Sequence, residues 1–265
     1  MPPAGTIAPV GTIRAENAAE CPREDDRPML RRPEFGRIRS ALAASSHFQS
    51  LDGSDLDRLA QLGRLHHLRH GERAARNGAY EDRFYLILSG AVRVSTQMPG
   101  AKEFVFAVLG PGSYFGLATA VRHATFTADA RAFGPTDLAV FPGSSLVELL
   151  DERPRLWKHV CGLLSRRLRL ALLVLRDNSV APLPERIARR LLGHALSSDL
   201  RGSREIDLRM TQADLALMLG ASRARTNAAL KALERTGLVR VGYRGIRILD
   251  LAALRRLAGP GIHAY

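Results

Sequence analysis

Two short helices joined by a tight turn are predicted within residues 211–239, which read TQADLALMLGASRARTNAALKALERTGLV. Apolar positions recur at helical spacing before Gly220, where only glycine can adopt a left-handed conformation without steric cost. Thr211 and Ser222 supply hydroxyls that can cap the two helices, and Asp214 stands where a capping box usually has Glu or Gln. This is the helix-turn-helix pattern, whose second helix enters the major groove of DNA.

The second helix has two unlike sides when its residues are placed at about 100° intervals. Its core side carries Thr226, Ala229, Leu230 and Leu233. Its other side is basic and amide-bearing, and Arg can read guanine while Asn can read adenine. We therefore expect Arg223 and Asn227 to read bases, and the following residues to contact phosphates: Thr211, Ser222, Arg225, Lys231 and Arg244. The alternative is an ordinary amphipathic helix pair with a solvated basic face.

A hairpin is predicted directly after the helix pair. Residues 237–250 read GLVRVGYRGIRILD, with two short apolar runs around Tyr243, Arg244 and Gly245. Short β-type runs on either side of a glycine-containing turn indicate a hairpin of the kind that forms a wing.

Upstream, residues 64–141 change to short strands separated by turn residues. They read RLHHLRH, DRFYLILSGAVRVSTQ, AKEFVFAVLG and DARAFGPTDLAVF, with glycines at near-regular intervals. Such a pattern is typical of an all-β barrel or roll. Residues 34–62 predict two short amphipathic helices before it. Residues 1–33 show no period and are predicted to be a disordered arm.

A long helix is predicted over residues 154–179, before Pro182 and Pro184. Positions spaced 4, 3, 4, 3 and 4 residues apart form a heptad seam, typical of a helix that pairs with a second copy. The seam consists of Trp157, Cys161, Leu164, Leu168, Ala171 and Leu175. A second apolar face also allows packing on the chain's own β domain, so both contacts are compatible with the pattern. We expect a helix-mediated homodimer.

Composition changes this picture little. The formal net charge is +13, and residues 182–265 hold 15 Lys and Arg against 7 Asp and Glu, a balance that favours phosphate backbones. An arginine-rich bias across a whole proteome would produce the same balance. The N-terminus lacks the pattern of a secretory signal, and the segment LLSRRLRLALLVL is too short and too charged to span a membrane. A cytoplasmic protein without membrane contact is expected.

The cysteines and histidines do not indicate a metal site. Cys21 and Cys161 have no metal-ligand spacing and form no disulfide framework. His66, His67 and His70 lie close together in the sequence, but His66 and His67 are adjacent in a predicted strand, so they point to opposite faces and cannot easily share an ion. Because the sequence also shows no nucleophile–base pair and no phosphate loop, we do not expect an enzyme.

A glycine-punctuated β-roll, a long helix and a C-terminal winged helix-turn-helix together resemble the Crp/Fnr family of bacterial transcription regulators. The resemblance covers roughly residues 40–250, and its most specific parts are YLILSGAVRV at 85–94 and residues 212–239. It implies an α+β fold with an antiparallel, cyclic-nucleotide-binding-like β-roll. It also implies a homodimer on a palindromic DNA operator, with RNA polymerase as a further partner. The expected divisions are 1–33, 34–153, 154–181 and 182–265, ending in the DNA-binding domain.

Family members that bind a cyclic nucleotide use a cassette resembling FGE followed by RTA, in which Glu binds the ribose and Arg neutralises the phosphate. Here the first triplet is Phe115, Gly116 and Leu117 and the second is Phe126, Thr127 and Ala128, so both charged positions are apolar. A phosphate placed there without its Arg would be desolvated and unpaired, at a cost of several kcal/mol. Ala171 and Leu172 also stand where relatives carry a Thr-Ser pair that reaches the purine.

The resemblance therefore predicts a roll that does not bind cyclic AMP in the usual way. The alternative is a rearranged pocket that takes a cyclic nucleotide or cyclic dinucleotide. An iron–sulfur cluster is not expected, because only Cys21 lies in the N-terminal region. For haem, the candidate axial ligands are Cys161, His159 and the group from His66 to His70. The family's recognition helix resembles S-R-E-T-V-x-R, whereas residues 222–228 read SRARTNA, which predicts a different operator or weaker discrimination between bases.

Overall fold

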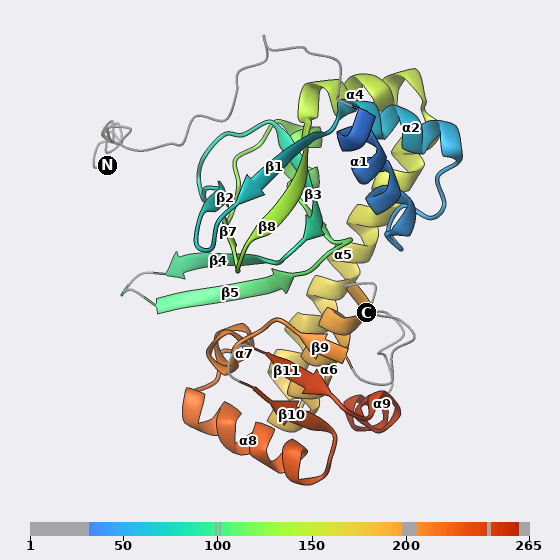
Figure 1. The fold of residues 1–265 in the computed structure, drawn as a ribbon. Helices are drawn as coiled ribbons and strands as arrows, with labels where there is room; N and C mark the ends of the chain where they lie inside the picture. The colour runs from blue at the N-terminus through green and yellow to red at the C-terminus, as the bar shows by residue number, and fades with distance from the viewer. Residues whose placement is uncertain (1–31, 99, 101, 198–205, 243–244, 260–265) are drawn as a thin grey trace, which may run out of the picture.

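The computed structural model describes residues 32–259 apart from residues 99, 101, 198–205 and 243–244. A β domain and a smaller domain are connected by one long helix, α5 (Arg155–Val180), which runs from one to the other (Figure 1). The predicted α+β fold is confirmed. None of the helices in the described part of the chain is both long enough and apolar enough to cross a membrane.

The β domain is a roll made of two antiparallel four-stranded sheets. One sheet has the order β1-β8-β3-β6, and the other has the order β2-β7-β4-β5. The first comprises β1 (Arg64–Leu68), β8 (Thr136–Pro142), β3 (Arg83–Ser89) and β6 (Tyr114–Phe115). The second comprises β2 (Arg73–Ala75), β7 (Asp129–Ala132), β4 (Val92–Met98) and β5 (Lys102–Leu109). The predicted antiparallel roll is therefore confirmed.

Four helices and the start of α5 cover one sheet of the roll (Figure 1). They are α1 (Arg32–Ala44), α2 (Gly53–Leu62), α3 (Leu117–Arg122) and α4 (Gly143–Glu152). The helix α1 begins at Arg32, so the last two residues of the predicted arm are helical, and residues 1–31 lie outside the described part. The sequence pattern had predicted α1 and α2, but it had not separated α3 and α4 from the strands beside them.

Strand β3 shows why the roll and its helices form one unit. Its run of apolar residues is buried on both faces, because successive side chains of a strand point to opposite sides. Phe84 and Leu86 pack in the cluster under the helices, whereas Tyr85 and Ile87 pack inside the roll. All four side chains are at most 2% exposed. The strand thus joins two hydrophobic cores.

The smaller domain packs four helices against a three-stranded antiparallel sheet of order β10-β11-β9. Its helices are α6 (Leu183–Ser197), α7 (Gln212–Leu219), α8 (Arg223–Arg235) and α9 (Leu251–Ala258). Its strands are β9 (Ile206–Leu208), β10 (Val239–Val241) and β11 (Ile246–Ile248). The last two form the predicted wing hairpin, whereas β9 and α9 were not predicted.

His194 is a titratable group in the core of the smaller domain. The side chain lies on α6, the residue is 9% exposed, and burial lowers the pKa of its imidazole from 6.5 to about 4. The unfolded chain therefore binds this proton at a higher pH than the folded chain does. It follows that the stability contributed by neutral His194 is present above pH 6.5 and is lost as the pH falls toward 4.

We expect the pH dependence of stability to depend on this residue. Between pH 7 and pH 4.5, His194 should reduce the free energy of unfolding by roughly 2–3 kcal/mol, at about 1.4 kcal/mol per pKa unit. Urea unfolding of the wild-type protein and of His194→Gln at the two pH values tests this. The substituted protein should lose less stability on acidification, and an equal loss in both proteins would contradict the assignment.

Candidate functional site

Two capped helices meet at a glycine turn in the smaller domain. At the start of α7, Thr211 Oγ1 accepts a hydrogen bond from the Asp214 backbone N–H at 3.0 Å, and Asp214 Oδ2 accepts one from the Thr211 N–H at 3.3 Å. Gly220 ends the helix with φ +59°, in the left-handed region. Ser222 then caps α8 by accepting from the Arg225 N–H at 3.3 Å. The predicted start and end of α7, the predicted start of α8 and their caps are confirmed.

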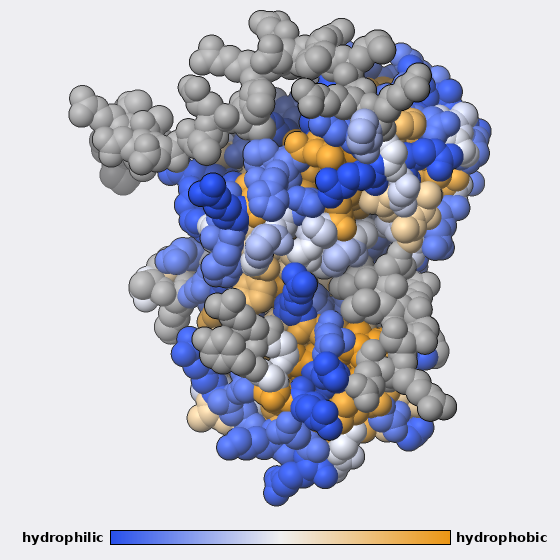
Figure 2. All heavy atoms as spheres, viewed as in Figure 1, coloured by the Kyte–Doolittle hydropathy of each residue, from blue (hydrophilic) through white to orange (hydrophobic). Residues whose placement is uncertain are grey.

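Helix α8 buries one side and exposes the other. Thr226, Leu230 and Leu233 are 0%, 1% and 6% exposed and pack toward the rest of the domain, as the helical period predicts. The outer side is basic, and in Figure 2 the end of the molecule that carries α8 is mainly hydrophilic. Its exposed cations are Arg223, Arg225, Lys231 and Arg235. None of these four forms an ion pair with a carboxylate among the residues described.

The other residues expected to contact DNA lie in different settings. Ser222 is exposed at the start of α8, while Thr211 is half-buried because it caps α7. Asn227 is half-buried, and its Oδ1 is covered without a hydrogen-bond partner in the described structure. Arg244 lies outside the described residues, in the part of the sequence between β10 and β11. The structure thus brings Arg223, Arg225, Asn227 and Lys231 together on α8, with Ser222 at its start, whereas Thr211 lies at the start of α7.

Aromatic side chains fill the inside of the roll. Tyr85 and Phe115 stack with ring centroids 4.5 Å apart and planes at 4°, and Phe126 meets Tyr85 edge-on at 6.3 Å. Tyr85 Oη lies 3.1 Å from both the Ala74 carbonyl oxygen and Glu81 Oε2. Burial raises the pKa of this phenol, so it stays neutral at physiological pH. The group at the centre of the roll is therefore an uncharged aromatic cluster.

The residues predicted for an effector pocket are not gathered around one cavity. Phe126 packs inside the roll, but Leu117 packs in the separate cluster under the helices. Gly116 has φ +80°, and a Cβ added there would lie 2.5 Å from the Arg83 carbonyl oxygen and 3.2 Å from the Phe126 ring. Thr127 is exposed and Ala128 is buried. Ala171 and Leu172 are exposed on α5, so within one chain they do not close a pocket over the roll.

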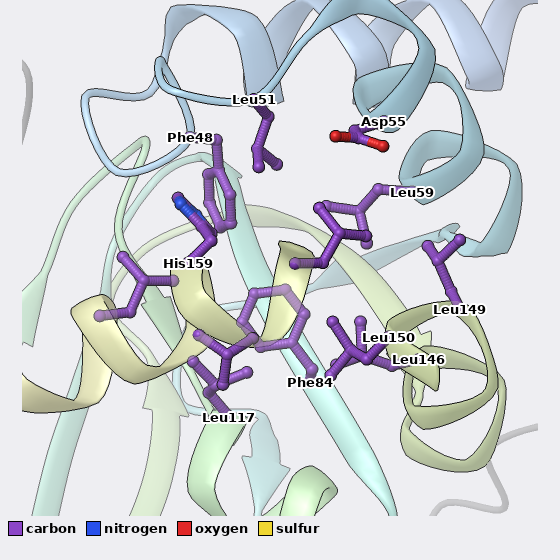
Figure 3. Close-up of a pocket in the computed structure, with 13 residues that line it drawn as sticks. Phe48, Leu51, Asp55, Leu59, Phe84, Leu117, Leu146, Leu149, Leu150 and His159 are labelled. Atoms are coloured by element: carbon purple, nitrogen blue, oxygen red, sulfur yellow. The ribbon is translucent and has the colours of Figure 1, made fainter. Parts of the chain in front are cut away.

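A small apolar cavity lies between the helices and the roll, with His159 at its edge (Figure 3). Its volume is about 30 Å³, enough for one or two water molecules, whereas small-molecule sites usually have roughly 300–1,000 Å³. His159 Nδ1 lies 3.1 Å from Ser50 Oγ, and Nε2 is buried without a partner in the described structure. Burial lowers the pKa of this imidazole. The cavity is too small for a nucleotide.

The other histidines and Cys161 are dispersed. His67 Nδ1 lies 2.8 Å from Asp137 Oδ1, and His70 Nδ1 accepts a hydrogen bond from the Gly134 N–H at 2.9 Å. Cys161 is exposed on α5. Within the described ranges, no group of three or more His, Cys, Asp or Glu side chains is placed to hold a metal ion. Cys21 lies outside the described residues.

The predicted heptad seam of α5 divides into two parts. Trp157 and Leu164 pack partly against the cluster between the helices and the roll. Farther along, Leu168 and Leu175 are 63% and 64% exposed, and the neighbouring Leu172 is 57% exposed. Cys161 and Ala171 are also exposed. The seam therefore packs on its own domain at one end and presents leucines to solvent at the other.

Comparison with known protein families finds two matching domains. Residues 65–153 match the cyclic nucleotide-binding domain, and residues 185–257 match the Crp-like helix-turn-helix domain. These two ranges contain the roll and the capped helix pair.

Individual relatives extend the likeness over most of the chain. The chain is 30% identical over 174 residues to the cyclic AMP receptor protein of Thermus thermophilus, covering 66% of this chain and 78% of that protein. It is 29% identical over 224 residues to the nitrogen fixation regulation protein FixK of Bradyrhizobium diazoefficiens, covering 82% and 92%. The FixK2 structure from Bradyrhizobium japonicum has a TM-score of 0.67 at 21% identity, covering 75% of this chain and 98% of that one. This last similarity concerns the fold.

Proposed function

The chain belongs to the Crp/Fnr family of transcription regulators, and on that premise we propose that it binds a palindromic operator as a homodimer through α8. As a member it is a DNA-binding transcription regulator, and we assign it a regulatory rather than a catalytic role. The observation that supports this proposal most directly is the unpaired basic side of α8. Cations without carboxylate partners are free to neutralise phosphates and release counterions from DNA.

Within α8, the proposed roles follow from the shape of each side chain. Arg223, in the first turn, can donate two hydrogen bonds to a guanine edge, whereas Arg225 and Lys231 flank it and suit phosphates. Asn227 can pair with adenine through both amide groups. Because its Oδ1 is covered in the free protein, the amide has to rotate when it meets a base. Ser222, Thr211 and Arg244 complete the proposed phosphate contacts.

Two substitutions separate base reading from phosphate contact. We expect Asn227→Ala to reduce the preference for the selected operator over a mismatched one by about 1–3 kcal/mol. Arg225→Ala should instead weaken binding to all sequences alike and reduce the slope of log affinity against log salt by about 1. Electrophoretic mobility shifts on both duplexes at several salt concentrations measure these effects.

Arg255→Ala, at an exposed arginine of α9, is the matched control for loss of one positive charge. It should change affinity less than Arg225→Ala and leave sequence preference unaltered. The assignment is wrong if neither Asn227→Ala nor Arg225→Ala changes DNA binding.

We propose the exposed leucines of α5 as the dimer interface. Leu168, Leu172 and Leu175 leave more than half of their surface in water, although burying one such side chain contributes about 1.5–3 kcal/mol. The heptad spacing of Leu168 and Leu175 places them in a coiled-coil seam, which a second α5 can cover. Two copies joined in this way would present two α8 helices to half-sites about 34 Å apart.

The dimer can be tested with a charge in the seam. Leu175→Glu places two like charges opposite each other in the proposed interface, so sedimentation should show a monomer at concentrations where the wild-type protein is a dimer. Arg166→Glu, exposed on the opposite side of the same helix, is the control and should remain dimeric. A dimer that persists in Leu175→Glu would rule out this interface.

We also propose that the roll has lost the usual site for cyclic AMP. Leu117 and Phe126 stand where the resemblance places the ribose-binding Glu and the phosphate-binding Arg, and both are less than 10% exposed. The stacked Tyr85 and Phe115 rings fill the interior, so a ligand would have to displace packed aromatic groups. A cyclic phosphate would then lack a paired cation, at a cost of several kcal/mol.

Titration calorimetry tests the loss of this site. Cyclic AMP and cyclic GMP should give no saturable heat at micromolar concentrations, while the Thermus thermophilus cyclic AMP receptor protein serves as the positive control. A saturable heat with either mononucleotide would contradict the proposal. A response to a cyclic dinucleotide alone would instead support a rearranged pocket.

A further inference from the structure

The hairpin of β4 and β5 reaches out of the roll and contacts the helix-turn-helix. Figure 1 shows it as the layer of the roll next to the smaller domain, and β5 contacts both α6 and α7. Val105 of β5 is fully buried, and it belongs to the hydrophobic core of the smaller domain rather than to that of the roll. The core of the smaller domain thus includes a residue of the roll.

Arg93 of β4 makes the polar part of this contact. Its Nε donates to Asp214 Oδ1 at 2.6 Å, while Nη1 and Nη2 donate to the two carboxylate oxygens of Glu103 at 2.5 and 2.8 Å. The side chains of Arg93 and Asp214 are 19% and 7% exposed. Hydrogen bonds to Glu103 raise the pKa of Arg93 and lower that of Glu103, so both remain charged. One guanidinium therefore joins the hairpin to α7.

The two carboxylate oxygens of Asp214 have different hydrogen-bond partners. Oδ2 accepts from the Thr211 N–H at 3.3 Å and from Thr211 Oγ1 at 2.6 Å, which closes the cap of α7. Oδ1 faces the roll and accepts from Arg93. In a capping box the acid side chain reaches back to the backbone N–H of the N-cap residue. Here the residue that caps the start of α7 also forms an ion pair with Arg93 of the roll.

We propose that Arg93 is a positioning residue for DNA recognition, which fixes the helix-turn-helix against the sensor through the capping carboxylate of Asp214. This inference rests on the proposed function of α8. We call the contact between Arg93 and Asp214 the brace. It does not cover the proposed DNA-binding surface, because the basic residues of α8 are exposed while the contact is formed. Loss of the brace lowers operator affinity because the two α8 helices of a dimer are no longer held at a fixed spacing.

A second ion pair attaches the smaller domain to α5. Asp177 near the end of α5 lies 2.7 Å from Arg189 of α6, so the two helices are already fastened to each other across Ala181 and Pro182. Arg93 and Val105 supply a further attachment of the smaller domain, to the hairpin of the roll.

A double-mutant cycle tests the proposal in the full-length protein. Arg93→Met should lower affinity for the selected operator about tenfold, within the roughly 5–150-fold range of coupling between sites. Asp214→Asn keeps an oxygen for the cap but loses the charge, and it should lower affinity to a similar extent. If Arg93 acts through Asp214, the two substitutions together lower affinity no further than either one alone.

Arg73→Met is the matched control. Arg73 is exposed on β2, and its register partner, Arg131, is also the partner of Arg93 on β4, so the two arginines lie on the same face of the sheet. This substitution removes the same charge and should leave affinity within about twofold of wild type, since one distant charge contributes only weakly to DNA binding. Should Arg93→Met fail to fold, Arg93→Lys replaces it in the cycle. Lysine keeps the positive charge but lacks the planar, forked guanidinium group of arginine.

Amide hydrogen exchange without DNA gives an independent readout. Arg93→Met should accelerate exchange both in β5 and in α7, whereas Arg73→Met should accelerate neither. Wild-type affinity in Arg93→Met, affinity losses that multiply in the double mutant, or unchanged exchange in α7 would each overturn the proposal. A wild-type chain that binds no DNA would instead refute the proposed function, and exchange would still show whether the brace exists.

Discussion

The exposed leucines in the middle of α5 are the constraint around which this molecule is arranged. A 26-residue helix begins in the core beneath the roll, where Leu156, Val160 and Leu163 are buried. It ends in the ion pair between Asp177 and Arg189. Both ends are thus fixed to a domain, and Leu168, Leu172 and Leu175 lie exposed between these two attachments. Helix α5 is therefore attached both to the roll and to the smaller domain. In our proposal its exposed leucines also bind α5 of a second copy of the chain.

The interior of the roll is the basis for our proposal that the chain has lost the usual site for cyclic AMP. A cyclic nucleotide site needs a cation for the phosphate and an acceptor for the ribose, and in our proposal the apolar residues Leu117 and Phe126 occupy the two corresponding positions. The stacked rings of Tyr85 and Phe115 fill the roll next to Phe126. The roll is well packed by its own side chains, and its β4–β5 hairpin contacts the smaller domain. In our account it therefore serves as a rigid support for α7 as well as a candidate receptor.

The sequence was most informative where structure is determined locally. Both ends of α7 and the start of α8 followed from Thr211, Gly220 and Ser222, because capping groups act within one turn of a helix. The buried side of α8 followed from the helical period. The strand β9 could not be predicted from its three residues alone, because its pairing with β11 is formed across the chain.

Contacts between distant segments could not be predicted in the same way. Arg93 and Asp214 are 121 positions apart, and neither residue type is unusual in its own segment. Asp at the third position of the α7 cap, in place of Glu or Gln, was the one local signal, and its second partner became visible only in the fold. The split of the α5 seam also depends on packing, since a heptad pattern does not specify which positions a chain's own domain covers.

The most direct test of the central claim, a dimer that places two α8 helices on one duplex, is hydroxyl-radical footprinting on the selected operator. Our account predicts two protected segments related by twofold symmetry on one face of the DNA, with centres about 34 Å apart. A single protected segment at saturation, or protection without a defined spacing, would contradict it.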